Sequence, residues 1–257
     1  LINTFQMVHV IFRCTMQNSI HLDSVDRSGA AGFDGPRGHR KAPSLPRAAT
    51  GAVPPTAAPM KILRLIGGLD PSHGGPPQSA VNNIIAAQRA GAETTLAFPI
   101  ERARTPSIDE AVARLEGEGV RVVAFDPTSM ISLRARSWGL NGAMAAWSLR
   151  EARRFDIVHC HGAWQMATLL ATLARRQGQP LVLTPHESLT GFDIAHASSG
   201  TLRFVKTALR RRYLGRFDLI ATASRLEADD SVPAGYARLA VLPHAVYDET
   251  LCQPLPR

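Results

Sequence analysis

Cysteines and long apolar runs are both scarce in this sequence, and each scarcity argues against a class of protein. The only cysteines, Cys14, Cys160 and Cys252, lie far apart without a CxxC pair, which argues against a disulfide framework and a structural zinc site. The apolar runs are all well short of the roughly 20 residues that a membrane-spanning helix needs. The stretch "MVHVIF" near the start is too brief for a secretory signal. We therefore expect a cytoplasmic protein.

Two common nucleotide-binding motifs are missing as well. The sequence contains neither GxGxxG nor GK[ST], so it lacks the dinucleotide fingerprint and the Walker loop. The net charge is +8, and residues 1–59, with six basic and three acidic residues, account for +3 of it. The remaining +5 suits phosphorylated ligands or an anionic membrane surface. No RNA- or DNA-reading motif accompanies this charge, so we do not expect nucleic-acid binding.

Residues 1–59 differ from the rest of the chain. They are rich in Gly, Pro, Ala and Arg and have no sustained apolar period, so they cannot bury enough surface to offset the entropy of ordering. We expect a disordered tail here. The alternative is a mis-assigned upstream extension, because Met60 immediately precedes the first strand-like run.

From Met60 onward, short apolar runs alternate with helical spacing. The runs predict strands over 61–66, 94–99, 120–125, 156–161, 180–185, 218–223 and 238–243. Between them, Val81, Ile84 and Ile85 recur at helical steps, as do Met166, Leu169, Leu170 and Leu173. This alternation predicts a Rossmann-like α/β domain over 60–250, a parallel sheet with helices on both faces. In such a sheet, ligands bind beyond the carboxyl ends of the strands.

The loop "GGLDPSHGG" follows the first predicted strand and contains Gly67, Gly68, Gly74 and Gly75. Its second glycine pair precedes a helix, whose free N–H groups and positive dipole end favour an anion such as phosphate. The alternative is a tight connection between strand and helix that binds nothing. The loop is therefore a candidate phosphate site.

Histidines lie at the ends of two further strands. His159 and His161 lie two residues apart, hence on one face of a strand, and Gly162 opens the next loop. No third metal ligand is evident beside them, and they could equally be satisfied core or capping groups. After Pro185, His186 and Glu187 project from a strand end, where an imidazole can donate to a sugar hydroxyl or act as acid or base.

The stretch "TLRFVKTALRRRYLGRFD" predicts an amphipathic helix with a basic stripe. Such a stripe is usually a solvated face, but it can also contact anionic lipid headgroups. The candidate membrane-surface residues are Arg203, Lys206, Arg210, Arg211 and Arg212.

Five motifs in order resemble a known family. They are "GGLDPSHGGPPQSAVNNIIAAQRAG", "FDIVHCHG", "PLVLTPHESL", "RFDLIATASRLEADD" and "LAVLPHAV". Together they are similar to the N-terminal half of the retaining GT-B glycosyltransferases of family 4. In that family, two Rossmann-like domains face each other; the first binds the acceptor and the second grips a nucleotide-sugar donor. Metal is not generally required.

The resemblance implies roles for particular residues. His186 corresponds to the catalytic histidine beside the transferred sugar, with Glu187 next to it, and Gly74 and Gly75 face the donor diphosphate. The acceptor-side candidates are His161, Gly162, Trp164 and Ser224. The acceptor is a glycan, a lipid-linked molecule or another small molecule, and peripheral contact with the inner membrane face fits this chemistry.

The sequence departs from the family pattern in two places. His244 and Ala245 stand where the family commonly has asparagine and glycine at the domain hinge. Residues 251–257 correspond to the start of an interdomain linker, and no donor-binding half follows. We therefore expect either a fragment of a longer enzyme or one half of a split gene, with the donor domain encoded separately. The expected function is hexosyl transfer from a nucleotide sugar, with the chain inactive alone. The alternatives are a non-catalytic module that binds a sugar or lipid-linked sugar, and a nucleotide-dependent enzyme of another class.

Overall fold

The computed structural model describes residues 58–70, 74–127, 141–197, 200–231 and 238–245, without the side chains of residues 202, 205 and 209–213. The expectations for residues 1–57 and 251–257 therefore lie outside the described residues. The same holds for the side chains of Arg210, Arg211 and Arg212.

Seven strands form one sheet in which every neighbouring pair is parallel. The order is β3-β2-β1-β4-β5-β6-β7. The strands are β1 (Lys61–Ile66), β2 (Glu93–Pro99), β3 (Arg121–Phe125), β4 (Ile157–His161), β5 (Leu181–Thr184), β6 (Leu219–Thr222) and β7 (Leu239–Val241). Each apolar run predicted as a strand forms one, so the expected Rossmann-like parallel sheet is confirmed.

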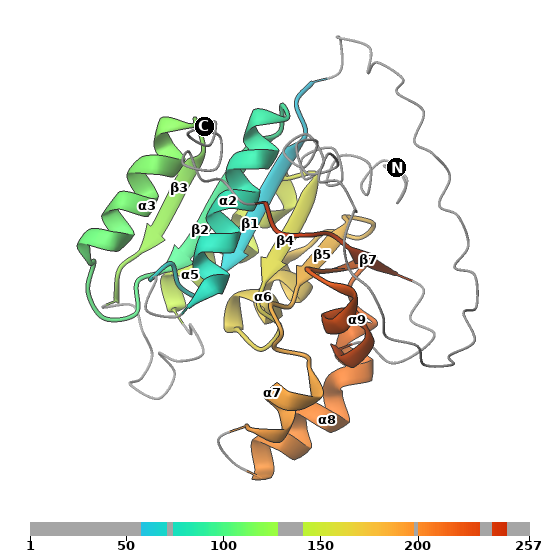
Figure 1. Ribbon diagram of the computed structural model, residues 1–257. Helices are drawn as coiled ribbons and strands as arrows, with labels where there is room; N and C mark the ends of the chain where they lie inside the picture. The colour runs from blue at the N-terminus through green and yellow to red at the C-terminus, as the bar shows by residue number, and fades with distance from the viewer. Residues whose placement is uncertain (1–57, 71–73, 128–140, 198–199, 232–237, 246–257) are drawn as a thin grey trace, which may run out of the picture.

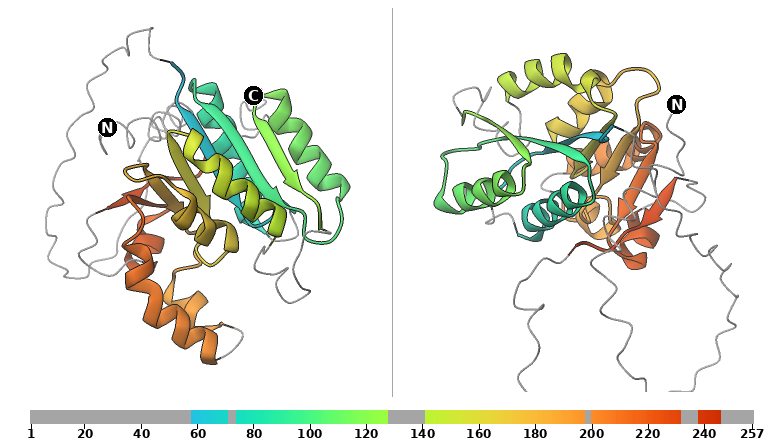
Figure 2. Two further views of the ribbon diagram at one scale, coloured as in Figure 1. Left: turned by 180° about the vertical axis from the view of Figure 1, so that it is seen from behind. Right: turned by 90° about the horizontal axis from the view of Figure 1, so that it is seen from above.

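Helices cover both faces of the sheet (Figures 1 and 2). Helices α2 (Gly75–Arg89) and α3 (Pro106–Gly117) lie on one face, whereas α5 (Gly142–Glu151), the 3-10 turn η3 (Ala152–Arg154) and α6 (Met166–Ala174) lie on the other. Helices α7 (Gly191–Ala195) and α8 (Gly200–Leu214) extend beyond the sheet, and α9 (Arg225–Ser231) precedes β7. Because both faces are covered, the central strands are buried almost throughout.

Helix α6 forms where it was predicted but buries a different face. Ala167, Ala171 and Ala174 pack into the core with the sheet, whereas Leu169 and Leu173 are 42% and 60% exposed. The apolar spacing of the leucines thus predicted the helix, but not its orientation. Small side chains let the helix backbone approach the sheet closely, which larger side chains at those positions would prevent.

The sheet order reverses between β1 and β4, which are hydrogen-bonded neighbours although two strands separate them in sequence. From this point, successive crossovers lead to opposite edges of the sheet, so the loops after β1 and β4 diverge. Such a switch point opens a crevice at the carboxyl ends of the strands. The structure therefore places the loops after Ile66 and His161 at the most favourable position for a ligand.

Candidate functional site

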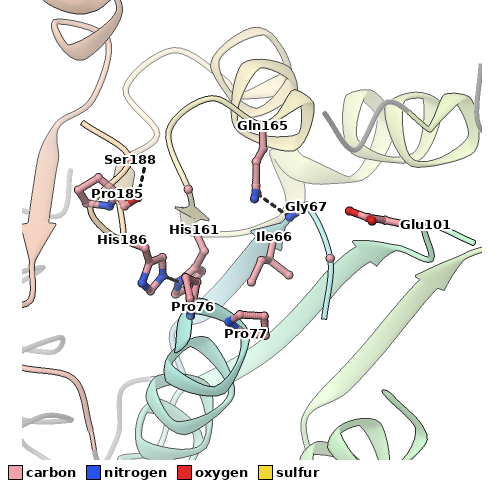
Figure 3. A pocket seen from close by; sticks show the side chains of 12 residues that line it. Ile66, Gly67, Pro76, Pro77, Glu101, His161, Gln165, Pro185, His186 and Ser188 are labelled. Atoms are coloured by element: carbon pink, nitrogen blue, oxygen red, sulfur yellow. Dashed lines mark hydrogen bonds between the residues drawn. The ribbon is translucent and has the colours of Figure 1, made fainter. Parts of the chain in front are cut away.

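A pocket of about 370 Å³ lies at this switch point (Figure 3). Its walls come from the loops after β1, β4 and β5, from the start of α2 and from the segment after β2. The lining residues are Ile66, Gly67, Gly68, Pro76, Pro77, Glu101, His161, Gly162, Gln165, Pro185, His186 and Ser188. Three of the predicted site residues, His161, Gly162 and His186, thus meet in one cavity.

Gln165 explains two of the glycines in the wall. Its Oε1 accepts a 2.6 Å hydrogen bond from the Gly67 N–H, and a Cβ on Gly67 would lie 2.5 Å from Gln165 Cδ. A Cβ on Gly162 would lie 2.9 Å from the same carbon, and Gly162 also has φ of +84°. The two loops therefore meet around one amide side chain, which requires a glycine on each side.

His186 and Glu187 form a left-handed corner at the end of β5, with φ of 50° and 63°. Left-handed backbone is unfavourable for residues other than glycine, and such strain concentrates at functional sites. Glu227 holds the corner, because its Oε1 accepts from the Glu187 N–H at 2.8 Å and its Oε2 accepts from the Ala223 N–H at 2.7 Å. The buried carboxylate thus fixes the backbone that presents His186.

Ser188 joins the loop after β5 to the loop after β4. Its Oγ accepts from the Ala163 N–H at 3.0 Å and donates to the Pro185 carbonyl at 2.5 Å. Its own carbonyl accepts from Trp164 Nε1 at 2.7 Å. These bonds fix the relative position of His161 and His186 on neighbouring strands.

Four imidazole rings form a continuous histidine stack from β4 to the segment after β7. Neighbouring ring centroids are 4.6 Å apart for His159 and His161, 5.3 Å for His161 and His186, and 5.1 Å for His186 and His244. His161 Nδ1 also lies 3.0 Å from His186 Nε2. The predicted same-face pair on β4 is therefore extended by two rings from distant parts of the chain.

Burial keeps the histidine stack neutral at ordinary pH. Desolvation, with the neighbouring charges of Arg64 and His186, holds the pKa of His159 well below its usual range, and desolvation does the same for the pKa of His161. The pKa of His186 falls to about 3, mainly through burial and secondly through His244. Burial also lowers the pKa of His244, although Glu227 and Glu187 oppose this shift.

Asn83 on α2 fixes the last ring of the stack. Its Oδ1 accepts from the Ala245 N–H at 3.0 Å, so its Nδ2 is the atom that donates to His244 Nδ1 at 3.3 Å. His244 therefore carries its proton on Nε2. The departure from the family pattern at His244 and Ala245 thus has a structural counterpart, a contact that ties this segment to both α2 and His186.

Gly74 and Gly75 do not line the pocket, although Pro76 and Pro77 beside them do. Gly74 has φ of 87° and caps α2, and a Cβ on Gly75 would meet nothing within 4 Å. The prolines in the first turn have no N–H to donate. The start of α2 thus offers fewer amide donors to an anion than a helix without prolines. The helix dipole and the Gly75 amide are still able to attract one.

The other sequence candidates lie around the pocket rather than in its wall. Trp164 donates a hydrogen bond to the Ser188 carbonyl, and Glu187 is exposed. Ser224 caps α9, with its Oγ accepting from the Glu227 N–H at 3.1 Å. Ser224 therefore supports the residue that holds the His186 corner.

Lys206 does not lie on an exposed basic stripe of α8, contrary to the prediction. It is only 8% exposed, donates to Asp193 Oδ2 at 2.7 Å and lies 5.7 Å from the ring centroid of Trp164. A lysine in this position joins α8 to α7 and to the loop after β4, so it is not available to a membrane surface. Arg203 is exposed.

Several residues of the site were not predicted. Glu101 follows β2 by two residues and lines the pocket, so the rule that ligands bind at strand ends could have identified it. Asn83 and Gln165 lie inside or next to predicted helices, and Glu227 lies in α9. No local pattern marks the long-range hydrogen bonds of these residues. A second pocket of about 410 Å³ shares Gly68 and Glu101 with the first.

Neither a metal-binding cluster nor a membrane-spanning helix is present among the described residues. No group of three or more His, Cys, Asp or Glu side chains could hold a metal ion within this part of the chain. None of the helices in the described ranges is long and apolar enough to cross a bilayer.

Comparison with known proteins identifies the family. The glycosyl transferase 4-like domain matches residues 74–245, whereas no curated protein gives a significant match. The chain is similar to UDP-GlcNAc 2-epimerase from Neisseria meningitidis, solved with UDP-GlcNAc bound, with 14% identity and a TM-score of 0.43 over 71% of this chain and 46% of that one. It is also similar to an isoflavone reductase, with 17% identity and a TM-score of 0.40 over 64% and 48%. The chain thus spans about half the length of these structures. Because the matched domain covers more than half of the sequence, this protein belongs to the glycosyl transferase 4-like domain family.

Proposed function

We propose that this chain is the acceptor-binding domain of a retaining GT-B glycosyltransferase that transfers a hexosyl group from a nucleotide sugar. The observation that carries the proposal is the pocket at the switch point of the sheet, into which the strained corner presents His186. Its mixture of imidazole, carboxylate, amide and glycine backbone suits a polyhydroxylated molecule, because sugar hydroxyls both donate and accept hydrogen bonds.

The charge of Glu101 indicates which part of the substrates this wall of the pocket contacts. Glu101 contributes a carboxylate, which repels a diphosphate and accepts hydrogen bonds from hydroxyl groups. We therefore assign this wall to the acceptor and the transferred sugar. The diphosphate approaches the side of Gly74 and Gly75, where the positive end of the α2 dipole lies. No metal is assigned to the reaction.

The proposal includes a second domain. The departing diphosphate must be stabilised by hydrogen-bond donors or positive charges. In this proposal a second domain, facing the pocket, supplies them. The chain is therefore inactive alone and acts with a donor-binding domain, encoded separately or joined to it. The runner-up is a non-catalytic module in which the same pocket holds a sugar without turnover.

The test measures release of nucleoside diphosphate from a panel of nucleotide sugars. The chain is assayed alone and after co-expression with the polypeptide encoded downstream of its gene. We expect release only with the second polypeptide. Turnover by the chain alone would overturn the claim of inactivity, and sugar binding without turnover in either preparation would favour the non-catalytic module.

Substitution of His186 gives a sharper readout in the active preparation. Asparagine tolerates left-handed backbone, so His186→Asn removes the imidazole while retaining the corner. We expect kcat to fall by about tenfold to a hundredfold, the effect of one hydrogen bond to a developing charge, with little change in KM for the donor. Gly75→Val should instead raise that KM. His196→Asn, at an exposed site directly after α7, is the matched control and should leave both constants unchanged.

A further inference from the structure

His161 has one ring nitrogen with a partner and one without. Its Nδ1 lies 3.0 Å from His186 Nε2, whereas its Nε2 is buried and makes no hydrogen bond within the described part of the chain. An unpaired buried polar atom costs about 1–3 kcal/mol, so it needs an explanation. His161 is fully buried and also belongs to the pocket wall, so the pocket is the place from which a bound molecule or water would supply the missing partner.

The neighbouring ring shows how a tautomer becomes fixed in this stack. His159 Nδ1 contacts Nη1 of Arg64, and a guanidinium can only donate. His159 must therefore carry its proton on Nε2, which donates to Thr184 Oγ1 at 2.8 Å. Both nitrogens of His159 are thus committed, so this ring cannot change tautomer when His161 does.

The pair of His161 and His186 has two possible arrangements. Each neutral ring carries one N–H, and one proton must lie between the two nitrogens that are 3.0 Å apart. Either His161 donates from Nδ1 and His186 keeps its proton on Nδ1, or His186 donates from Nε2 and His161 keeps its proton on Nε2. The hydrogen bond therefore requires the same tautomer in both rings.

We propose that His161 is a positioning residue that decides which nitrogen of His186 carries the proton. The partner of His161 Nε2 in the pocket makes the selection. A partner that only accepts, such as a phosphate or carbonyl oxygen, places protons on both Nε2 atoms and turns His186 Nδ1 into an acceptor. A partner that only donates turns His186 Nδ1 into a donor, and a sugar hydroxyl is compatible with both arrangements.

The meaning of this selection for catalysis rests on the proposed function, in which His186 contacts the transferred sugar. The coupling between the rings does not, because it follows from one contact and one missing partner. Absence of glycosyl transfer would therefore overturn the proposed function and leave the coupling intact. Unequal tautomers would overturn the coupling and leave the proposed function intact.

The experiment uses the full 257-residue chain labelled with 15N in its nine histidines. Two-bond 1H–15N correlation spectra at pH 7.5 distinguish the two tautomers of each ring, and single His→Gln variants at the other seven histidines identify the signals of His161 and His186 as the remaining pair. We expect His161 and His186 to show the same tautomer. His159 is the internal reference and should be protonated on Nε2. Opposite tautomers in His161 and His186 would overturn the proposal, and this comparison requires no variant at either position to fold.

A variant then separates positioning from packing. His161→Phe retains a flat ring in the stack but has no nitrogen, so the ring nitrogens of His186 should shift toward the average of mixed tautomers. Thr184→Val is the matched control, because it removes the acceptor of His159 without touching the pair. It should leave the His186 signals unchanged. A His186 tautomer that stays the same in His161→Phe would show that His161 is only structural.

Discussion

At the scale of single residues, Gly67 differs from Gly75 because a side chain packs against it. Gln165 occupies the space where a Cβ would lie and takes the Gly67 N–H as a donor. Gly75, in the same segment of chain, has open space instead. The two positions therefore form a matched pair in which only one glycine is required by a close approach.

Substituting alanine at both positions tests this difference. Gly67→Ala must displace the flexible end of Gln165 and break its hydrogen bond, so we expect the free energy of unfolding to fall by about 1–2 kcal/mol. Gly75→Ala should change it by less than about 0.5 kcal/mol. Urea unfolding of both variants measures the difference. Equal effects at the two positions would show that the Gln165 contact contributes nothing to stability.

At the scale of elements, Lys206 connects α8 to α7. Its ammonium group is almost buried between Asp193 and the ring of Trp164, so it joins two helices that otherwise extend beyond the sheet (Figure 1). Lys206→Met should lower the free energy of unfolding by about 1–2 kcal/mol, because Asp193 loses a charged hydrogen bond while remaining partly hydrated. Arg203→Gln, one turn away and exposed, should leave it unchanged in the same urea titration.

Because Lys206 is buried, fewer residues of α8 remain as candidates for contact with a membrane. Arg203 remains as an exposed cation, and Phe192 and Phe204 are each 72% exposed on α7 and α8, a combination typical of helices that contact lipid headgroups. The double variant Arg203→Gln, Phe204→Ser should therefore reduce sedimentation with vesicles that contain anionic lipid. Vesicles of phosphatidylcholine alone serve as the control. Equal sedimentation of the double variant and the unaltered chain would refute membrane contact through these helices.

The elements also show how far sequence reasoning reaches. The strands were predictable because a parallel sheet covered on both faces requires short continuous apolar runs such as Lys61–Ile66 and Leu181–Thr184. The buried face of α6 was not predictable, because its alanines pack against the sheet whereas Leu169 and Leu173 are exposed. This orientation depends on the distance between the helix and the sheet. Periodicity identifies a helix, but the space available beneath it determines its orientation.

The site was predictable to the extent that it follows from topology. His161, Gly162 and His186 lie at strand ends, and the parallel order brings those ends together. The contacts of Gln165 with Gly67 and of Asn83 with Ala245 join residues 98 and 162 positions apart. Such contacts depend on loop conformation, and no local residue pattern specifies it.

At the scale of the whole molecule, the neutral histidine stack makes stability depend on pH. An unfolded histidine has a pKa of about 6.5, whereas burial lowers the pKa values of His159, His161 and His186 in the folded domain, to about 3 for His186. Depressed folded values mean that the stabilisation is fully present above pH 6.5 and is lost as the pH falls below it. Arg64 beside His159 adds to this loss, because a second positive charge next to it is unfavourable.

We expect the free energy of unfolding to depend steeply on pH. Each histidine that stays unprotonated in the folded state lowers the free energy of unfolding by about 1 kcal/mol between pH 6.5 and 5.5, so three lower it by about 3 kcal/mol over that unit. Urea titrations at pH 7.5, 6.5 and 5.5 measure it above the range in which carboxylates titrate. His186→Gln should remove one of the three contributions. Stability that is constant from pH 7.5 to 5.5 would contradict neutral burial of the stack.

The contact between Asn83 and the His244–Ala245 segment sets the point from which the rest of the chain departs. That point is fixed to α2 by two hydrogen bonds, and the ring of His244 lies 5.1 Å from that of His186. Anything joined to the chain after Ala245 is therefore tethered beside the pocket. A short flexible connection from such an anchor gives an attached partner an effective concentration on the order of millimolar at its binding site. Weak intrinsic affinity between this domain and a linked partner would then suffice to keep the pocket covered.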